Sequence, residues 1–380
     1  MNASLPVPAL PSETDLDELR ALARSIFSRS GADTLNAQRT ATPFDESLWQ
    51  TLAASGLTLL STPESAGGSG AGIAETAAVL AVGAAHAAPV PVAETDLLAA
   101  WLLVLAGLDV PSGPLTSGAG EVSIAEGPAG SLVVSGTLER VPWARATEAI
   151  VVLGSTGERD VVLVVPSGRC SITAGHNLAH EPRDFVRFEI DLSSHLVVSV
   201  GEAVRAEWFL RGALVRAAQT CGALERALTL SVDHASSRIQ FGRPLGRFQA
   251  VQHLIAEAAG EVTIARAALD VAIRTVAQRG FTNPNAELAV AVAKAQAAAA
   301  AGVVSRVAHQ VHGAIGFTLD HQLRHFTLRA LAWRGEFGDE CSWQRRIGQV
   351  ALEAGGEGIW SLITSGLPDA QSCPSNPGTG

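Results

Sequence analysis

The chain has 380 residues, enough for two or three compact domains, and its 47% hydrophobic and 17% charged residues are typical of a folded globular protein. The formal net charge of -10 argues against nucleic acid or an anionic membrane as the main partner, although a locally basic pocket remains compatible with it. The longest uncharged apolar run, Leu97 to Leu108, is too short to span a bilayer, and the N-terminus lacks a signal-peptide pattern. We therefore expect a cytoplasmic protein without a membrane segment.

Residues 1–113 have the pattern of a helical domain. Apolar residues recur at helical spacing from Leu16 to Phe27, and Asp45 is a suitable N-cap for a helix that ends at Gly56. An Ala-rich helix is expected to begin near Ile73, and another to run from about Thr95 to Leu108.

Residues 114–200 contain short β-branched runs separated by turn clusters, which predict a reduced, antiparallel β domain. From Glu202 the helical spacing returns and predicts a C-terminal helical bundle over 201–365, followed by a flexible tail at 366–380. Five helices are expected in the bundle, at 202–236, 246–279, 285–311, 319–334 and 340–364. The order of helices, strands and helices predicts a segregated α+β fold that is mainly α.

One connection between the predicted helices, SSRIQFGRPLGRFQAVQH at 236–253, is more basic and aromatic than a helix connection requires. Its arginines, Arg238, Arg243 and Arg247, could form a pocket for a phosphorylated small molecule. A second segment, HQVHGAIGFT at 309–318, closes a long Ala-rich helix with two glycines. These glycines either cap the helix or let the backbone approach a ligand closely, and the sequence leaves both roles open.

A metal site is not expected. His321 and His325 have the spacing of a zinc-protease helix, but Gln322 stands in the place of its catalytic glutamate and no third ligand is evident. The four cysteines are scattered without metal or disulfide spacing. We interpret the two histidines as surface or core residues.

Several of these segments resemble motifs of the acyl-CoA dehydrogenase family. The 236–253 segment is similar to the family's Arg-x-Gln-Phe-Gly hairpin and the Phe-Gln helix start after it, and QVHGAIGFT resembles its Gln-x-His-Gly-Gly-x-Gly turn, with Ala314 in place of one glycine. The segment LWQTLAASGLTLLSTPESAGGSGAG at 48–72 resembles the family's N-terminal helix and loop. The resemblance covers nearly the whole chain and implies the acyl-CoA dehydrogenase fold.

The resemblance also implies a cofactor, FAD, held across a subunit interface. In the family the hairpin's arginine reaches the FAD diphosphate, a pairing that suits the planar guanidinium. Carried over to this sequence, the cofactor-binding residues are Arg238, Gln240, Phe241 and Gln249 from the hairpin, and Gln310, His312 and Gly313 from the turn. The family further implies an acyl-CoA substrate, an electron-transfer flavoprotein as electron acceptor, and an oligomer that is a dimer of dimers.

The sequence departs from the family where the catalytic base should stand. The reaction needs a carboxylate near the thioester α-carbon, and family members place it before the last long helix or early in the first C-terminal helix. Here these positions are Gly338 and Gly212, and Ala213 replaces a substrate-facing arginine. Among the acids Glu336, Asp339 and Glu340, Asp339 is the closest substitute for the base; the alternative, which the sequence favours, is a solvated acid at the N-terminus of a helix.

The β region departs as well. The family's Thr-Glu and Gly-Ser-Asp motifs, which contact the flavin ring and the substrate, are missing, with Glu126 either a remnant or a turn residue and Trp143 a packing residue. The chain therefore resembles partner subunits of two-gene actinobacterial acyl-CoA dehydrogenases, which form α2β2 assemblies acting on steroid side-chain CoA thioesters. Two hypotheses follow: a subunit that desaturates acyl-CoA together with a partner, or a non-catalytic subunit that clamps FAD and stabilises a catalytic homologue.

Overall fold

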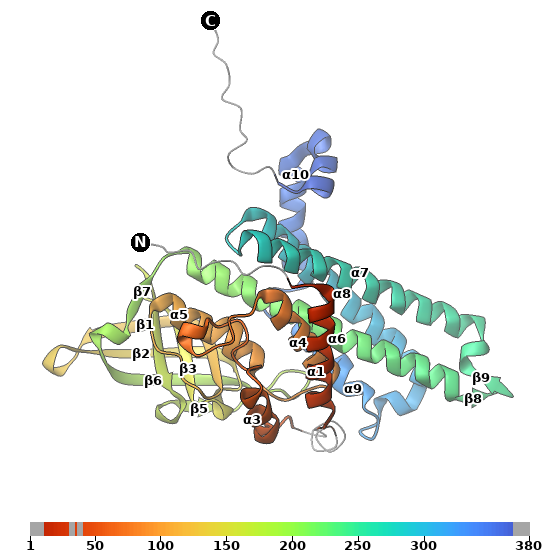
Figure 1. Ribbon diagram of the computed structural model, residues 1–380, viewed down its shortest axis with the longest axis horizontal. Coiled ribbons are helices and arrows are strands. Elements are labelled where there is room, and N and C mark those ends of the chain that lie inside the picture. The colour runs from red at the N-terminus through yellow and green to blue at the C-terminus, as the bar shows by residue number, and fades with distance from the viewer. Residues whose placement is uncertain (1–10, 30–34, 36–40, 368–380) are drawn as a thin grey trace, which may run out of the picture.

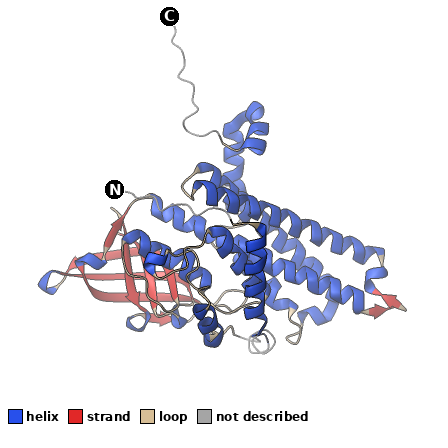
Figure 2. Ribbon diagram, viewed as in Figure 1, coloured by secondary structure: helices blue, strands red, loops and turns tan. Residues whose placement is uncertain are grey.

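A computed structural model describes residues 11–29, 35 and 41–367 of the chain. Of the predicted tail at 366–380, only Gly366 and Leu367 fall within this part, so the flexibility expected there lies outside the described residues. The sheet stands at one end of the molecule and long helices extend away from it (Figures 1 and 2). This arrangement agrees with the mainly α, α+β fold expected from the sequence.

The N-terminal part is helical, as predicted. It contains α1 (Glu13–Arg29), α3 (Glu46–Ala54), the short 3-10 helix η1 (Glu64–Ala66) and α4 (Ile73–Ala85). The expected N-cap is confirmed, because the carboxylate of Asp45 accepts a hydrogen bond of 3.0 Å from the backbone N–H of Leu48. Buried side chains of α1, α3 and α4 pack together with Phe27 and Trp49 among them.

The helix expected from Thr95 to Leu108 begins as a π-helix, η2 (Glu94–Ala100), and continues as α5 (Trp101–Ala106). Every residue of η2 is buried, including two acids. The carboxylate of Asp96 accepts hydrogen bonds from the backbone N–H groups of Ser61 (2.9 Å) and Thr62 (3.0 Å), so it fixes the preceding loop. π-Helical turns occur mostly at functional positions, where they aim a side chain that a regular helix would not.

The seven-stranded sheet has the order β5-β6-β2-β1-β3-β4-β7. Its strands are β1 (Leu115–Glu126), β2 (Ser131–Pro142), β3 (Ala149–Ser155), β4 (Asp160–Pro166), β5 (Ser171–Thr173), β6 (Arg183–Ser193) and β7 (Val198–Val200). The prediction of a purely antiparallel arrangement is wrong in one place, because β1 pairs with β3 in parallel from Leu115 opposite Ala149. The small residues of Leu115–Gly120 give little strand signal, and only the second half of β1 was expected.

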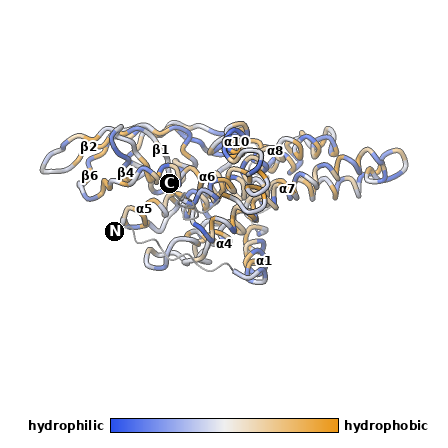
Figure 3. Tube along the Cα trace, turned by 90° about the horizontal axis from the view of Figure 1, so that it is seen from above, coloured by the Kyte–Doolittle hydropathy of each residue, from blue (hydrophilic) through white to orange (hydrophobic). Residues whose placement is uncertain are grey.

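The C-terminal bundle consists of α6 (Ala203–Ser237), α7 (Gln249–Arg279), α8 (Pro284–His312), α9 (Leu323–Trp333) and α10 (Glu340–Ser365). Hydrophobic and hydrophilic residues alternate along its helices (Figure 3), and the core between them contains many alanines, which permit close helix approach. The segment Pro284–Phe317 is long and apolar enough to cross a bilayer, but 61% of its most apolar stretch is buried inside the protein, as expected of a core helix.

Two helices of the bundle differ from the prediction in detail. The helix expected at 319–334 begins only at Leu323, because a 3-10 helix, η8 (Gly313–Phe317), and a turn precede it. The last helix is kinked at Gly355, which has φ +68°, a conformation that glycine tolerates and other residues avoid.

Candidate functional site

A two-stranded hairpin, β8 (Ile239–Gln240) and β9 (Arg243–Pro244), connects α6 to α7 at the end of the bundle farthest from the sheet (Figure 1). At its tip Phe241 has φ +50° and is 91% exposed. The guanidinium of Arg243 lies 4.1 Å from the centre of the Phe248 ring, which also meets Phe241 edge to face. A bulky residue held in the left-handed region with its side chain in solvent is strained and unburied, which favours a role in binding.

The second predicted cofactor motif lies at the same end of the bundle. The ring of His312, at the end of α8, stacks on that of His234, with centroids 4.6 Å apart. His234 is four residues before Arg238, so the fold brings the two motifs together across α6 and α8. Gly313 follows His312 with φ +64°, is exposed, and serves as the C-cap of α8. Both roles considered for this glycine therefore remain compatible with its position.

Most of the predicted cofactor-binding residues are exposed at this end, and only His312 is buried. Among these predicted residues, four polar side chains have no hydrogen-bond or ion-pair partner within the described part of the chain: Arg238, Gln240, Gln249 and Gln310. Such a set of unused donors and acceptors around an exposed aromatic ring is suited to an anionic ligand with a planar group.

A different arrangement is found between the sheet and the bundle, where three carboxylates and three guanidiniums are buried together. Glu336 is the centre: it accepts hydrogen bonds from Nε of Arg183 (2.8 Å) and Nε of Arg216 (2.7 Å). Arg216 extends the cluster by donating to Glu94 of η2 (2.7 Å). The cluster therefore links the N-terminal helices, the start of β6 and the bundle.

Glu181 forms the second half of the cluster. Its carboxylate accepts hydrogen bonds from Nε of Arg329 (3.1 Å) and from the indole N–H of Trp333 (2.8 Å), both on α9. It also accepts one from Nη2 of Arg183 (3.3 Å), which joins it to the Glu336 half. The charges balance, and each buried charge has a partner, as burial requires.

The cluster shifts the pKa of its carboxyl groups downward. Burial alone raises the pKa of Glu336, but the guanidiniums of Arg183 and Arg216 outweigh it and lower the value to about 2. The pKa of Glu181 is also lowered, since Arg183 and Arg329 outweigh its burial. Both groups are therefore ionised at neutral pH, and neither is suited to take up a proton as a general base.

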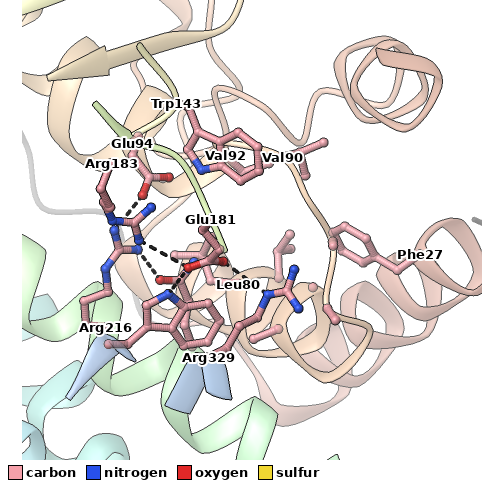
Figure 4. A pocket seen from close by; sticks show the side chains of 17 residues that line it. Phe27, Leu80, Val90, Val92, Glu94, Trp143, Glu181, Arg183, Arg216 and Arg329 are labelled. Carbon is pink, nitrogen blue, oxygen red and sulfur yellow. Dashed lines mark hydrogen bonds and ion pairs between the residues drawn. The ribbon is translucent and has the colours of Figure 1, made fainter. Parts of the chain in front are cut away.

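Only a small cavity of about 30 Å³ remains beside this cluster. Figure 4 shows the charged side chains of Glu181, Arg216 and Arg329 on one side of it and apolar side chains such as Phe27 and Val90 on the other. The space is enough for water but not for an acyl chain.

The two positions expected from the sequence to correspond to the family's catalytic base, Gly212 and Gly338, have no room for a side chain. The ring of Phe337 lies against the backbone of Gly212, so closely that even a methyl group there would overlap it. At Gly338 a methyl group would overlap the indole of Trp343, which donates a hydrogen bond of 3.0 Å to the carbonyl of Phe337. We call Arg334–Gly338 the sealing loop, because it carries Glu336 of the ion-pair cluster and Phe337, whose ring covers Gly212.

The sealing loop is held from α8 by Lys294, which is the only lysine of the chain and is 1% exposed. Its ammonium group donates to the carbonyls of Trp333 (3.3 Å), Arg334 (2.8 Å) and Gly338 (3.0 Å). Burial lowers the pKa of Lys294 to about 8.

The predicted base, Asp339, lies at the start of α10 and outside the cavity. Its side chain is the N-cap of this helix and accepts a hydrogen bond of 2.8 Å from the backbone N–H of Ser342, a contact that lowers its pKa. This geometry corresponds to the alternative considered for Asp339, a helix cap, and favours that role over catalysis. Glu340 follows it in the first turn of α10, and Ala213 is fully buried.

The remaining candidates are placed as follows. Glu126 is exposed at the end of β1, and Trp143 is 4% exposed and borders the cavity, in agreement with packing. His321 precedes α9, so the two histidines do not share a helical face as the spacing suggested. His325 is buried, and burial lowers its pKa to about 3. The described residues contain no group of three or more His, Cys, Asp or Glu side chains placed to hold a metal ion.

Most of the buried ion-pair cluster was not anticipated from the sequence. Arg216 stands inside an apolar helical stretch, and charged residues are almost never fully buried unless they are paired. That placement was the available signal. The pairing itself joins residues more than a hundred positions apart, so no local pattern reveals it.

Comparison with known proteins identifies the family to which the chain is similar. Residues 13–109 match the family model of the acyl-CoA dehydrogenase N-terminal domain, and residues 201–349 match that of the C-terminal domain. The chain is 31% identical over 337 residues to the acyl-CoA dehydrogenase FadE27 of Mycobacterium tuberculosis, covering 82% of this chain and 89% of that protein. It is 32% identical to the acyl-CoA dehydrogenase IpdE2 of the same organism, over 76% of this chain and 81% of that one.

Among solved structures, a chain of the ChsE4-ChsE5 complex from Mycobacterium tuberculosis has a TM-score of 0.81 and 27% identity, over 90% of this chain and 98% of that one. A chain of the Tcur3481-Tcur3483 steroid acyl-CoA dehydrogenase variant has a TM-score of 0.77 and 25% identity, with the same coverage. The fold is thus that of flavoprotein dehydrogenases that act on acyl-CoA. The chain belongs to the acyl-CoA dehydrogenase family of oxidoreductases, which confirms the resemblance found in the sequence.

Proposed function

We propose that this chain is one subunit of a heteromeric, FAD-dependent acyl-CoA dehydrogenase, in which it grips the cofactor of a homologous partner subunit while its own acyl site is closed. The observation that carries the proposal is that neither Gly212 nor Gly338 has room for a side chain, because Phe337 and Trp343 occupy the space. A subunit built in this way needs a base from another chain.

The hairpin end supports the cofactor half of the proposal. Arg238 would pair with the FAD diphosphate, Phe241 and Gln240 would pack around the cofactor, and Gln249, Gln310, His312 and Gly313 would line the same site. The exposed and unpaired state of these polar side chains fits an anionic cofactor shared with a neighbour. When bound, FAD supplies the acceptor for the hydride that leaves the substrate.

For the substrate we propose an acyl-CoA thioester with a steroid side chain, because one of the similar structures is named as a steroid acyl-CoA dehydrogenase. We further propose a dimer of dimers in the cytoplasm that passes electrons to an electron-transfer flavoprotein. Both similar structures are of complexes of two different proteins, which supports a heteromer over a homo-oligomer.

The test is to express the chain alone and together with a homologous subunit that carries the glutamate, and to record visible absorption, mass and turnover for each preparation. We expect a colourless chain alone, and a yellow complex with half as many flavins as chains. A yellow homo-oligomer that turns over acyl-CoA by itself would contradict the proposal.

Within the complex, Arg238→Ala tests the hairpin directly. The flavin content should fall, whereas Arg306→Ala, which removes an exposed ion pair with Glu257 on the same bundle, should leave it unchanged. Equal flavin content in the two variants would contradict the cofactor assignment.

A further inference from the structure

Lys294 is buried on α8 at a place where no carboxylate contacts it directly. An ammonium group has three hydrogens, and all three are directed at backbone carbonyls: those of Trp333, Arg334 and Gly338. The first two belong to the C-terminal end of α9, where the backbone carbonyls carry partial negative charge. The third closes the sealing loop, so one side chain holds both ends of it.

The sealing loop has a conformation that needs such support. Phe337 has φ +53° and Gly338 has φ +88°, so two consecutive residues are left-handed, the first of them against its preference. This backbone aims the Glu336 carboxylate at Arg183 and Arg216 and lays the Phe337 ring on Gly212. If the loop relaxed, the ion pairs and the ring contact would be lost together.

We propose that Lys294 is the positioning residue that keeps the sealing loop in the conformation that holds Glu336 in the ion-pair cluster and Phe337 against Gly212. This inference concerns the chain itself and stands independently of the cofactor and partner proposed above. No other amine is available for the task, because every other basic side chain apart from histidine is an arginine, and a planar guanidinium does not reproduce the tetrahedral directions of an ammonium group.

The test is hydrogen exchange of the backbone amides, measured by mass spectrometry on the full chain, or on its complex if the chain assembles with a partner. Lys294→Met keeps the length of the side chain but removes the ammonium donor from all three carbonyls. We expect the peptides that cover the sealing loop to exchange about tenfold faster or more, with the sheet peptides unchanged.

Two further variants keep the result specific. Val304→Ala creates a cavity ten positions along α8, at another fully buried residue, and should not single out the sealing loop. Lys294→Arg keeps the positive charge and should recover part of the protection. If Lys294→Met exchanges like Val304→Ala, or if Lys294→Arg exchanges like the unchanged protein, the tetrahedral ammonium group is not what holds the loop, and the proposal is overturned.

The single lysine also provides an independent readout, because an amine-reactive label can modify no other side-chain amine in the chain. Lys294 should label slowly in the folded protein and faster when the loop opens. Glu336→Gln should therefore accelerate labelling, whereas Asp160→Asn, which breaks the Arg205 pair at the sheet, should not. Equal labelling rates in these two variants would also overturn the proposal.

Discussion

The two ends of the first bundle helix, α6, have opposite chemistry. At its C-terminal end the hairpin presents arginine, glutamine and phenylalanine side chains to solvent, with Phe241 91% exposed. At its N-terminal half, Gly212 is covered by a ring and Arg216 is buried in an ion-pair cluster. The arginine and glutamine side chains of the hairpin point to solvent, whereas the charged side chain in the N-terminal half of α6 is paired within the chain. This contrast supports the proposal that the chain contributes to the site of a neighbouring subunit.

The contrast between the two ends of α6 depends most on the buried ion pairs of Glu336. Glu336→Ala should leave two buried guanidiniums without their shared carboxylate and lower the free energy of unfolding by about 3–5 kcal/mol. Glu287→Gln, which removes the partly exposed pair with Arg346, should cost less than about 1 kcal/mol. Urea unfolding of both variants measures the difference. Similar losses of unfolding free energy in the two variants would mean that the buried cluster contributes little to the stability of this part of the protein.

The same carboxylate predicts an acid dependence. The pKa of Glu336 is lowered from 4.5 to about 2 in the folded chain, so its contribution is complete above about pH 4.5 and is lost as the pH falls towards 2. The loss should reach about 3 kcal/mol, on the scale of 1.4 kcal/mol per unit of pKa. Between pH 2 and 6, the free energy of unfolding should depend less steeply on pH in Glu336→Gln than in the unchanged protein. An equal pH dependence in both would assign the acid sensitivity to other groups.

The contact between Phe337 and Gly212 can be tested by one methyl group. Gly212→Ala should destabilise the chain by about 1–3 kcal/mol, because the added carbon overlaps the ring. Gly260→Ala is the matched control on α7, where nothing lies within 4 Å, and alanine should stabilise the helix by up to about 1 kcal/mol. Thermal unfolding compares them. A tolerated alanine at Gly212 would show that the closed side can open.

The smallest effect is expected at Asp339. Asp339→Asn should leave turnover of the assembled enzyme unchanged, because asparagine caps a helix as well as aspartate does and the side chain lies outside the cavity. Steady-state assays of the complex with an acyl-CoA substrate measure this. A complete loss of turnover would restore Asp339 as the base and remove the contrast between the two ends.

The sequence predicted well those features that depend on local patterns of residues. The spacing of apolar residues located α6, α7, α8 and α10 to within a few residues, and Asp45 was correctly recognised as a cap. The hairpin was recognisable because its arginines and aromatic residues were out of place in a helix connection. These features depend on neighbours in the chain, which a sequence displays directly.

What the sequence could not supply depends on distant partners. The parallel pairing of β1 with β3 involves small residues with weak strand preference, and Glu181 and Arg329 meet from positions almost 150 residues apart. The sequence identified Gly212 and Gly338 as positions without a base, but not that rings had taken the space. A glycine in the sequence does not reveal whether the space beside it is open or occupied by another side chain. Only the packing in the structure distinguishes the two cases.

The buried cluster has a consequence for how the molecule melts. Its members come from η2, from the start of β6 and the residues just before it, from α6 and α9, and from the sealing loop. Each part of the chain therefore holds charges that another part neutralises. No part can leave without stranding an ion in the interior. Heat should therefore unfold the helices, the sheet and the bundle in a single calorimetric transition, although their cores are separate.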